Sequence, residues 1–244
     1  MGLSVIVPAY NEARRLRETL PRLHEYVAGL GEPGEIIVVN DGSTDDTAQV
    51  VMDLARSYKE LRLIHRDRNR GKGASVRRGV LAAREAHVLF TDADLSAPIE
   101  EAAKLRAKLI EGCQVAIGSR RLPGSDVQVR QSWFQRLAGR VLSTLVRLLF
   151  LRGIADSQCG FKAFERGAAE AIFKRQQLDG FGFDVEALWL ARRLGYQVAE
   201  VPIVWRDDPE SHIRPFRDAA RMLGELVRFR LNAWRGRYDL RAGP

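Results

Sequence analysis

Two aspartates separated by one residue, Asp92 and Asp94, follow a short apolar stretch at residues 87–91. Hard divalent cations such as Mg²⁺ and Mn²⁺ prefer carboxylate oxygens, and two aspartates at this spacing converge when the chain bends out of a strand. A cation held there would bridge the oxygens of a diphosphate. One aspartate could equally cap a following helix. The pair therefore predicts a metal site and, taken alone, leaves a structural role open.

A glycine-rich segment at residues 69–73 precedes a predicted helix and carries Lys72 between two glycines. Phosphate groups bind well at a helix N-terminus, and glycines let them approach the backbone. The segment matches neither the P-loop pattern nor the dinucleotide-binding fingerprint. A phosphate contact through Lys72 is the functional prediction, and an ordinary glycine turn is the alternative.

An alternation of strands and helices is predicted to position these residues. Short apolar stretches are typical of buried strands, and the segments between them show helical spacing. We expect strands at residues 3–7, 35–39, 61–65, 87–91 and 114–118, and helices at 11–29, from Ser43 or Thr44 to Arg56, after Gly73 and from Pro98. This order predicts an α/β fold with a mostly parallel sheet and crossover helices.

Candidate binding residues, most of them charged or aromatic, follow four of the five predicted strands. They are Pro8, Tyr10 and Glu12 after the first, Asp41 after the second, Asp92 and Asp94 after the fourth, and Arg120 after the fifth. Ligands of open parallel sheets bind at the carboxyl ends of the strands, so we expect these side chains to form one site. Such a site would suit a charged ligand bound with a metal ion.

The alternation ends after residue 119. A long helical stretch is expected at residues 132–151, then a helix at 184–194, a strand at 197–204 and a final helix at 215–231. No linker or repeat interrupts the chain, so we expect a single domain covering residues 1–244.

Positive charge is concentrated in two segments. The net charge is +8; residues 120–152 hold seven basic residues and one acidic residue, and residues 210–244 hold eight and four. Both segments carry apolar residues at helical spacing, a combination that favours binding to an anionic membrane surface. The alternative is that each apolar stripe faces the core. Neither segment resembles a nucleic-acid module, so we expect no nucleic acid partner.

Composition excludes several classes of protein. With 45% hydrophobic residues the chain is globular rather than disordered, and two cysteines are too few for a disulfide scaffold and favour a reducing cytosol. The longest apolar run, residues 141–151, is interrupted by Arg147 and is too short to span a bilayer. No signal peptide is expected at the N-terminus.

Taken together, the motifs resemble those of family 2 glycosyltransferases of the GT-A fold. The resemblance extends from residue 3 to about residue 205 and rests on residues 5–12, 39–45, 69–73, 92–94 and 118–120. Residues 156–162 (DSQCGFK) and 182–186 (GFDVE) are similar to the polyprenyl-phosphate branch, which includes dolichyl-phosphate glucosyltransferases and mannosyltransferases.

The resemblance implies roles for the residues that follow the strands. Pro8, Tyr10, Glu12 and Asp41 would hold the base and ribose of a nucleotide sugar, Asp92 and Asp94 would engage its ribose, its diphosphate and Mg²⁺ or Mn²⁺, and Arg120 would face an acceptor phosphate. Two positions depart from the relatives. Ser96 stands where mannosyl-phosphate synthases often have a glutamine metal ligand, and Asn40 stands where many relatives have a first aspartate. A third protein ligand of the metal is therefore unassigned, and the contact with the nucleotide base depends on Asp41.

The implied activity is the transfer of one hexose from a nucleotide sugar to a polyprenyl phosphate, with inversion and with UDP-glucose favoured over GDP-mannose. A phosphomonoester has its second pKa near ~6 and is already a nucleophile at neutral pH. Such an acceptor needs cations, for which Arg120, Arg130 and Arg136 are the candidates. A hydroxyl acceptor would instead need a base, Asp184 or Glu186, although Asp184 could also cap the helix that follows Phe183. A non-catalytic module that binds nucleotide sugar or anionic lipid is the remaining alternative.

Three parts are expected within the domain. Residues 1–119 would bind the nucleotide sugar, residues 120–210 the acceptor, and residues 211–244 would form an amphipathic tail facing the membrane. Trp133, Trp234 and Tyr238 are expected at the level of the lipid headgroups, and Ser211 or Arg214 would contact the diphosphate. The protein is expected to be peripheral, on the cytoplasmic face of a membrane.

Overall fold

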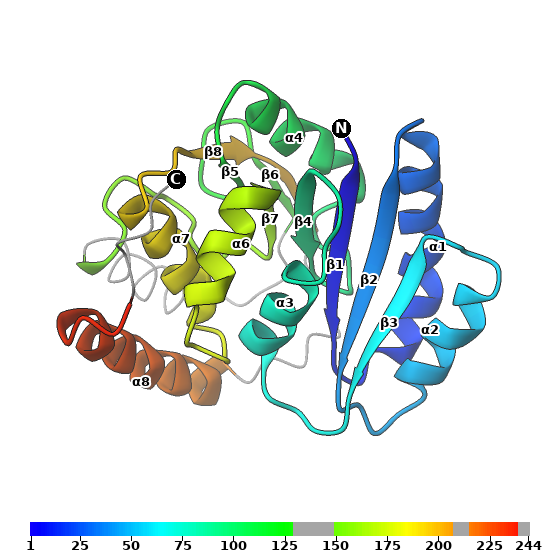
Figure 1. Cartoon of the computed structure of the whole chain (residues 1–244), viewed down its shortest axis with the longest axis horizontal. Helices are drawn as coiled ribbons and strands as arrows, with labels where there is room; N and C mark the ends of the chain where they lie inside the picture. The colour runs from blue at the N-terminus through cyan, green and yellow to red at the C-terminus, as the bar shows by residue number, and fades with distance from the viewer. Residues whose placement is uncertain (129–148, 207–214, 239–244) are drawn as a thin grey trace.

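A seven-stranded sheet runs through the centre of the computed structural model, which describes residues 1–128, 149–206 and 215–238 (Figure 1). The strand order is β3-β2-β1-β4-β7-β5-β8. The strands are β1 (Leu3–Ala9), β2 (Gly34–Asp41), β3 (Leu61–Arg66), β4 (His87–Thr91), β5 (Val115–Ser119), β7 (Phe161–Glu165) and β8 (Val198–Pro202). β1 and β4 lie side by side near the middle and are buried on both faces, which explains why their sequences are continuous apolar runs.

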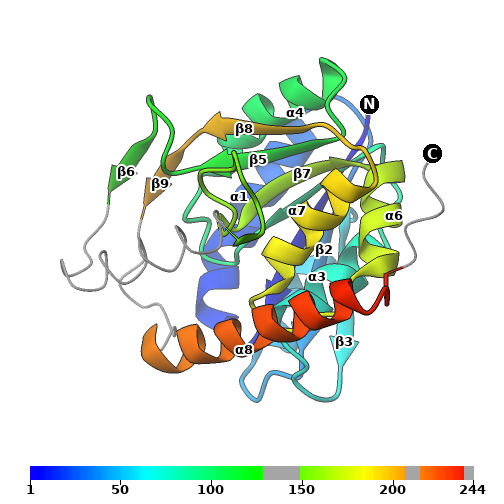
Figure 2. The ribbon, with the colours of Figure 1, turned by 90° about the vertical axis from the view of Figure 1, so that its left-hand side faces the viewer.

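Helices cover both faces of the sheet (Figures 1 and 2). One face packs against α1 (Ala13–Gly29), α2 (Thr47–Ala55), the short 3₁₀ helix η1 (Ile99–Glu101) and α4 (Ala102–Ile110). The other packs against α3 (Lys72–Val80), α6 (Arg166–Arg175), α7 (Phe183–Arg193) and α8 (Pro215–Trp234). Two neighbouring residues of β1 point to opposite faces: Val5 packs in the core on the side of α1, and Ile6 packs in the core on the side of α3. The predicted α/β fold is confirmed.

The prediction of a mostly parallel sheet is confirmed, and the exception is one antiparallel strand near its centre. β7 lies between β4 and β5 and runs antiparallel to both, with Phe90 opposite Lys162 in the register. Sequence analysis missed this strand, because Lys162 interrupts the apolar pattern of the segment, and it also missed α6, which follows directly. Lys162 is fully buried nonetheless: its Nζ donates hydrogen bonds to Asp184 and to the Cys159 carbonyl, both at 2.5 Å.

Two predicted elements have different ends in the structure. α2 begins at Thr47 and is not capped by Ser43 or Thr44; Ser43 Oγ instead accepts the Asn11 N–H, and the Thr44 N–H donates to Asn11 Oδ1. The strand expected at residues 197–204 divides into β8 and β9 (Val204–Arg206), which leaves the main sheet to pair with β6 (Asp126–Gln128). Most of the helix expected at residues 132–151 lies outside the described residues.

The expected final helix is present as α8, which lies at the end of the molecule where β1, β2 and β3 finish (Figures 1 and 2). Within the ranges that the structure describes, no helix is both long and apolar enough to cross a membrane. Tyr238, just after α8, is 5% exposed and donates its hydroxyl to Glu186 at 2.5 Å. The prediction that Tyr238 sits among lipid headgroups is therefore wrong, whereas Trp234 is 83% exposed.

Candidate active site

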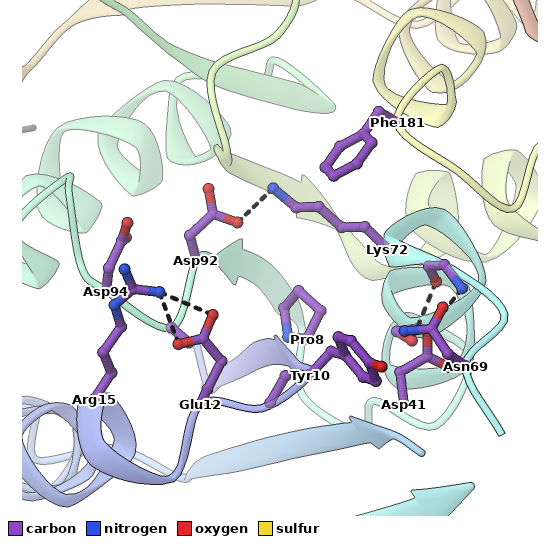
Figure 3. A pocket seen from close by; sticks show the side chains of 14 residues that line it. Pro8, Tyr10, Glu12, Arg15, Asp41, Asn69, Lys72, Asp92, Asp94 and Phe181 are labelled. Carbon is purple, nitrogen blue, oxygen red and sulfur yellow. Dashed lines mark hydrogen bonds and ion pairs between the residues drawn. The ribbon is translucent and has the colours of Figure 1, made fainter. Parts of the chain in front are cut away.

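A cavity of about 390 Å³ opens at the carboxyl ends of β1, β2 and β4 (Figure 3). This volume lies within the range of small-molecule sites, and the position is where open α/β sheets bind their ligands. The lining residues are Pro8, Ala9, Tyr10, Glu12, Arg15, Asp41, Asn69, Gly71, Lys72, Ser75, Asp92, Ala93, Asp94 and Phe181. Polar residues predicted after three separate strands thus gather in one cavity.

Asp41 organises the glycine-rich segment at one side of the cavity. Its carboxylate accepts the N–H of Arg70 at 3.1 Å and that of Gly71 at 2.7 Å, and it lies 3.3 Å from Arg66 Nη1. Gly71 has φ of 107°, and a Cβ at this position would lie 2.5 Å from the Asp179 carbonyl. Both features require glycine here. Asp41 therefore fixes the loop that presents Lys72.

Tyr10 and Pro8 form the floor beside Asp41 (Figure 3). Tyr10 is 46% exposed and lines the cavity, so its ring is available to a ligand. The turn after β1 is fixed by Asn11, a non-glycine residue with φ of 57° whose side chain accepts the Thr44 N–H. An aromatic face next to a fixed carboxylate can hold a nucleobase and its ribose.

Glu12 is paired with Arg15, a residue that the sequence analysis did not select. Arg15 Nη1 donates to both oxygens of Glu12, at 3.0 and 2.8 Å. In Figure 3 the Arg15 guanidinium lies between Glu12 and Asp94. The charge of Glu12 is thus balanced within the cavity. The signal for Arg15 was its position one helical turn after Glu12 at the start of α1.

The aspartate pair predicted after β4 lies on the opposite side, next to Lys72. Lys72 Nζ is 2.5 Å from Asp92 Oδ1, and Asp94 Oδ1 accepts the Ser96 N–H at 2.9 Å. Burial opposes the charge of Lys72, but the carboxylates of Asp92 and Asp184 raise its pKa above the ordinary value. Burial, together with the charge of Asp92, raises the pKa of Asp94. Both observations indicate that this corner holds more negative charge than it can easily accommodate.

The carboxylate pair fits a divalent cation. Asp92 and Asp94 offer hard oxygen ligands in a cavity, and Gly160 lies so close to Asp92 that a Cβ there would overlap Oδ2. Among the described residues there is no cluster of three His, Cys, Asp or Glu side chains that could enclose a metal. A cation held by two aspartates would take its remaining ligands from diphosphate oxygens and water, as Mg²⁺ commonly does.

Two further ion pairs involve predicted site residues that do not line the cavity. Arg120 donates from Nε and Nη2 to the two oxygens of Asp156, at 2.7 and 2.9 Å, and its guanidinium lies 4.8 Å from the centre of the Trp205 ring. Burial opposes the charge of Asp156, but Arg120 lowers its pKa below the usual value. Asp184 is paired with Lys162 at 2.5 Å and makes no capping bond in the first turn of α7. The helix-cap alternative for Asp184 is therefore wrong.

The cavity thus brings together Pro8, Tyr10, Glu12, Asp41, Lys72, Asp92 and Asp94. Arg120 and Asp184 do not line it and form ion pairs, and Glu186 is fully buried, where it accepts the N–H groups of Gln177 and Leu178. Arg130, Arg136, Ser211, Arg214 and Trp133 lie outside the described residues. Besides Arg15, the sequence analysis missed Phe181, which lines the cavity, and Lys162, which lies in a motif it had quoted without a role.

Relatives of known activity share the sequence over nearly its whole length. The profile of the family described as Glycosyl transferase family 2 matches residues 4–173. A dolichyl-phosphate beta-glucosyltransferase of Drosophila melanogaster is 36% identical, covering 96% of this chain and 77% of the relative. The enzyme of the same name from Saccharomyces cerevisiae is 34% identical, covering 94% of this chain and 74% of the relative.

Solved structures share the fold at lower identity. Glucosyl-3-phosphoglycerate synthase from Mycobacterium tuberculosis, crystallised with Mn²⁺, UDP and phosphoglyceric acid, matches with a TM-score of 0.69 and 22% identity, over 95% of this chain and 78% of the other. Mannosyl-3-phosphoglycerate synthase from Rubrobacter xylanophilus matches with a TM-score of 0.70 and 19% identity, over 98% and 76%. The first of these synthases has also been crystallised with Mg²⁺ and UDP.

The family match covers more than half of the chain, and the curated relatives exceed 30% identity over most of their own length. The expected resemblance, including its dolichyl-phosphate branch, is confirmed. This chain belongs to glycosyltransferase family 2 and is a glycosyltransferase of the GT-A-like fold.

Proposed function

We propose that this chain transfers one glucose from UDP-glucose to a polyprenyl phosphate at a membrane surface, and that it uses Mg²⁺ or Mn²⁺. The observation that carries the proposal is the cavity in which Asp92, Asp94 and Lys72 meet Asp41 and Tyr10, in a chain 36% identical to a dolichyl-phosphate beta-glucosyltransferase. Glucose is α-linked in UDP-glucose, so a β product, as the relatives' names specify, requires inversion.

The donor is bound from both sides of the cavity. Tyr10, Pro8 and Asp41 hold the uridine, and Glu12, kept in place by Arg15, faces the ribose. Asp92 and Asp94 hold the cation, which when bound stabilises the charge of the departing UDP. Lys72 is the chain's own cation at this position, and its raised pKa keeps it charged beside the diphosphate.

The state of Asp184 supports a phosphate acceptor over a hydroxyl acceptor. A hydroxyl must lose its proton to a base within hydrogen-bond reach. Asp184 is 5% exposed, is engaged by Lys162 and is not among the residues that line the cavity, and Glu186 is fully buried. A phosphate dianion needs no such base.

Cations must then hold the acceptor against the negative charge of the donor. Arg120 is fixed by Asp156 through Nε and Nη2, and within the described part of the chain its Nη1 makes no hydrogen bond. We assign this edge of the guanidinium to the acceptor phosphate. Arg130 and Arg136 remain candidates for the same task.

We propose that the chain acts at the cytoplasmic face of a membrane, as a peripheral protein. The polyprenyl tail stays in the bilayer, so the protein must reach the phosphate at the interface. The outer face of α8 supports this, because Leu223, Val227, Leu231 and Trp234 are all exposed and exposed arginines lie on the same helix.

A transfer assay tests the proposal. Labelled UDP-glucose or GDP-mannose is incubated with a short polyprenyl phosphate and Mg²⁺ or Mn²⁺, and the product is extracted into organic solvent. We expect lipid-soluble label from UDP-glucose only, and its loss with EDTA. Lipid-soluble label from GDP-mannose alone would show that the donor is GDP-mannose. Metal-dependent hydrolysis of the donor without a lipid product would indicate a hydroxyl acceptor. Donor binding without any turnover would show that the chain is a binding module.

A further inference from the structure

The C-terminal helix α8 is joined to a turn at the mouth of the donor cavity through one carboxylate. Glu225 Oε2 of α8 accepts the Gly182 N–H at 2.7 Å. A Cβ at Gly180 would overlap Glu225 Oε1, and a Cβ at Gly182 would lie 3.0 Å from Oε2. The carboxylate therefore lies directly against the backbone of the turn at residues 180–182, in space that only glycines leave open.

The same turn is locked on its other side to the segment that carries Lys72. The Asp179 carbonyl accepts the Ala74 N–H at 3.0 Å, and its carboxylate is 2.7 Å from Arg77 Nη2. Gln176 Nε2 bridges the carbonyls of Gly73 and Leu178, at 3.0 and 2.6 Å. The turn and the residues just before it thus lie between α8 and the first turns of α3, the helix that begins at Lys72.

Phe181 is the side chain that this turn presents. It stands between the two glycines, is 42% exposed and lines the donor cavity, although it comes from the second half of the chain. In Figure 3 its ring lies next to Lys72, on the side away from Tyr10. Because Phe181 is exposed and lines the cavity, its ring is available to a ligand that enters there.

The position of Phe181 selects the part of the donor that it would cover. Tyr10 and Asp41 occupy the nucleoside side of the cavity, and Lys72 with Asp92 occupies the diphosphate side. The group beyond the diphosphate is the hexose, whose ring C–H groups form an apolar face. An aromatic ring is the side chain best suited to pack against such a face.

We propose that Phe181 binds the hexose of the donor and that Glu225 is a positioning residue that holds Phe181 in the cavity. The inference rests on the proposed function, because it presumes a nucleotide-sugar donor in this cavity. It makes α8 part of the donor site, although α8 contributes no lining residue among those described.

Calorimetry on the whole protein with Mn²⁺ separates the sugar from the nucleotide. For Phe181→Ala we expect the Kd for UDP-glucose to rise about tenfold, the scale of one aromatic contact, while the Kd for UDP changes less than about twofold. Glu225→Ala should show the same selective loss, because the turn is no longer held. Glu225→Gln keeps an acceptor for the Gly182 N–H and should recover most of the affinity. The double variant should be no weaker than Phe181→Ala, because both act on one contact.

Gly224→Ala is the matched control on α8, since a Cβ there meets nothing within 4 Å. It should bind both ligands as the wild type does. If Glu225→Ala fails to fold, Gly180→Ala is used in its place, because the added Cβ displaces the same carboxylate. Equal weakening of UDP and UDP-glucose, or unchanged binding of both, overturns the inference. A wild type that binds GDP-mannose instead overturns only the proposed donor, and the same comparison is then made with GDP-mannose and GDP.

Discussion

At the scale of single residues, the main feature of the site is how its carboxylates are balanced by positive charges. Asp92 is paired with Lys72, and Glu12 with Arg15. Asp94 accepts the Ser96 N–H, and burial together with the charge of Asp92 raises its pKa, although Arg15 opposes this shift. A buried carboxylate next to a second carboxylate is unfavourable in the free protein, and a bound cation would relieve this cost.

The variant Asp94→Asn separates the contribution of this carboxylate to activity from its cost in stability. We expect hexose transfer to fall by about 100-fold or more, since one of two cation ligands is lost. The free energy of unfolding without metal should be unchanged or higher, because the amide keeps the size of the side chain and removes a buried charge. Transfer rates and urea unfolding check the two parts. A variant that keeps wild-type transfer would remove Asp94 from the cation site.

At the scale of elements, the approach of β7 to β4 leaves no room beside Asp92. Gly160, just before β7, would overlap the Asp92 carboxylate if it carried a Cβ. Gly160→Ala should rotate Asp92 away from Lys72 and the cation, lowering transfer about tenfold or more with little loss of stability, because the obstructed atom ends a side chain that can move. Gly167→Ala on α6 is the control, as its Cβ would meet only Glu165 Oε1 at 3.9 Å. Equal activity of the two variants would contradict this account.

The elements also show what could be predicted from sequence. Strand ends such as Asp41, Asp92 and Asp94 were predictable because a local apolar run followed by polar residues fixes their place at the edge of the sheet. β7 was not, because the burial of Lys162 depends on Asp184, which lies 22 residues away. Phe181 was not either, because its place in the cavity depends on Glu225, 43 residues beyond its neighbour Gly182. Contacts between distant segments leave no periodic signal in the sequence.

At the scale of the whole molecule, α8 has two apolar faces, one buried and one exposed. Met222, Leu226 and Phe229 pack into the core beside α7, whereas Leu223, Val227, Leu231 and Trp234 face outward. The helix lies where the parallel strands end, so its outward face and the donor cavity are at the same end of the protein (Figures 1 and 2). The sequence analysis treated a core-facing stripe and a membrane-facing stripe as alternatives for this segment. The structure shows a core-facing stripe and, beside it, an exposed apolar face that is available for the proposed membrane contact.

The outward face gives the last prediction. The double change Val227→Ser and Trp234→Ser removes two apolar side chains that are 61% and 83% exposed, so folding should be preserved. Burial of each in a bilayer is worth about 1.5 kcal/mol or more, and binding to vesicles that contain anionic phospholipid should therefore weaken at least about tenfold. Met52→Ser is the control and should not change binding, because Met52 is 46% exposed and belongs to α2, which lies on the opposite side of the view from α8 in Figure 1. Salt should weaken binding of the wild type, because it screens the exposed arginines Arg228 and Arg235. Absence of wild-type binding at low salt would refute docking through α8. If Met52→Ser weakened binding as much as the double change does, the protein would adsorb without a defined orientation.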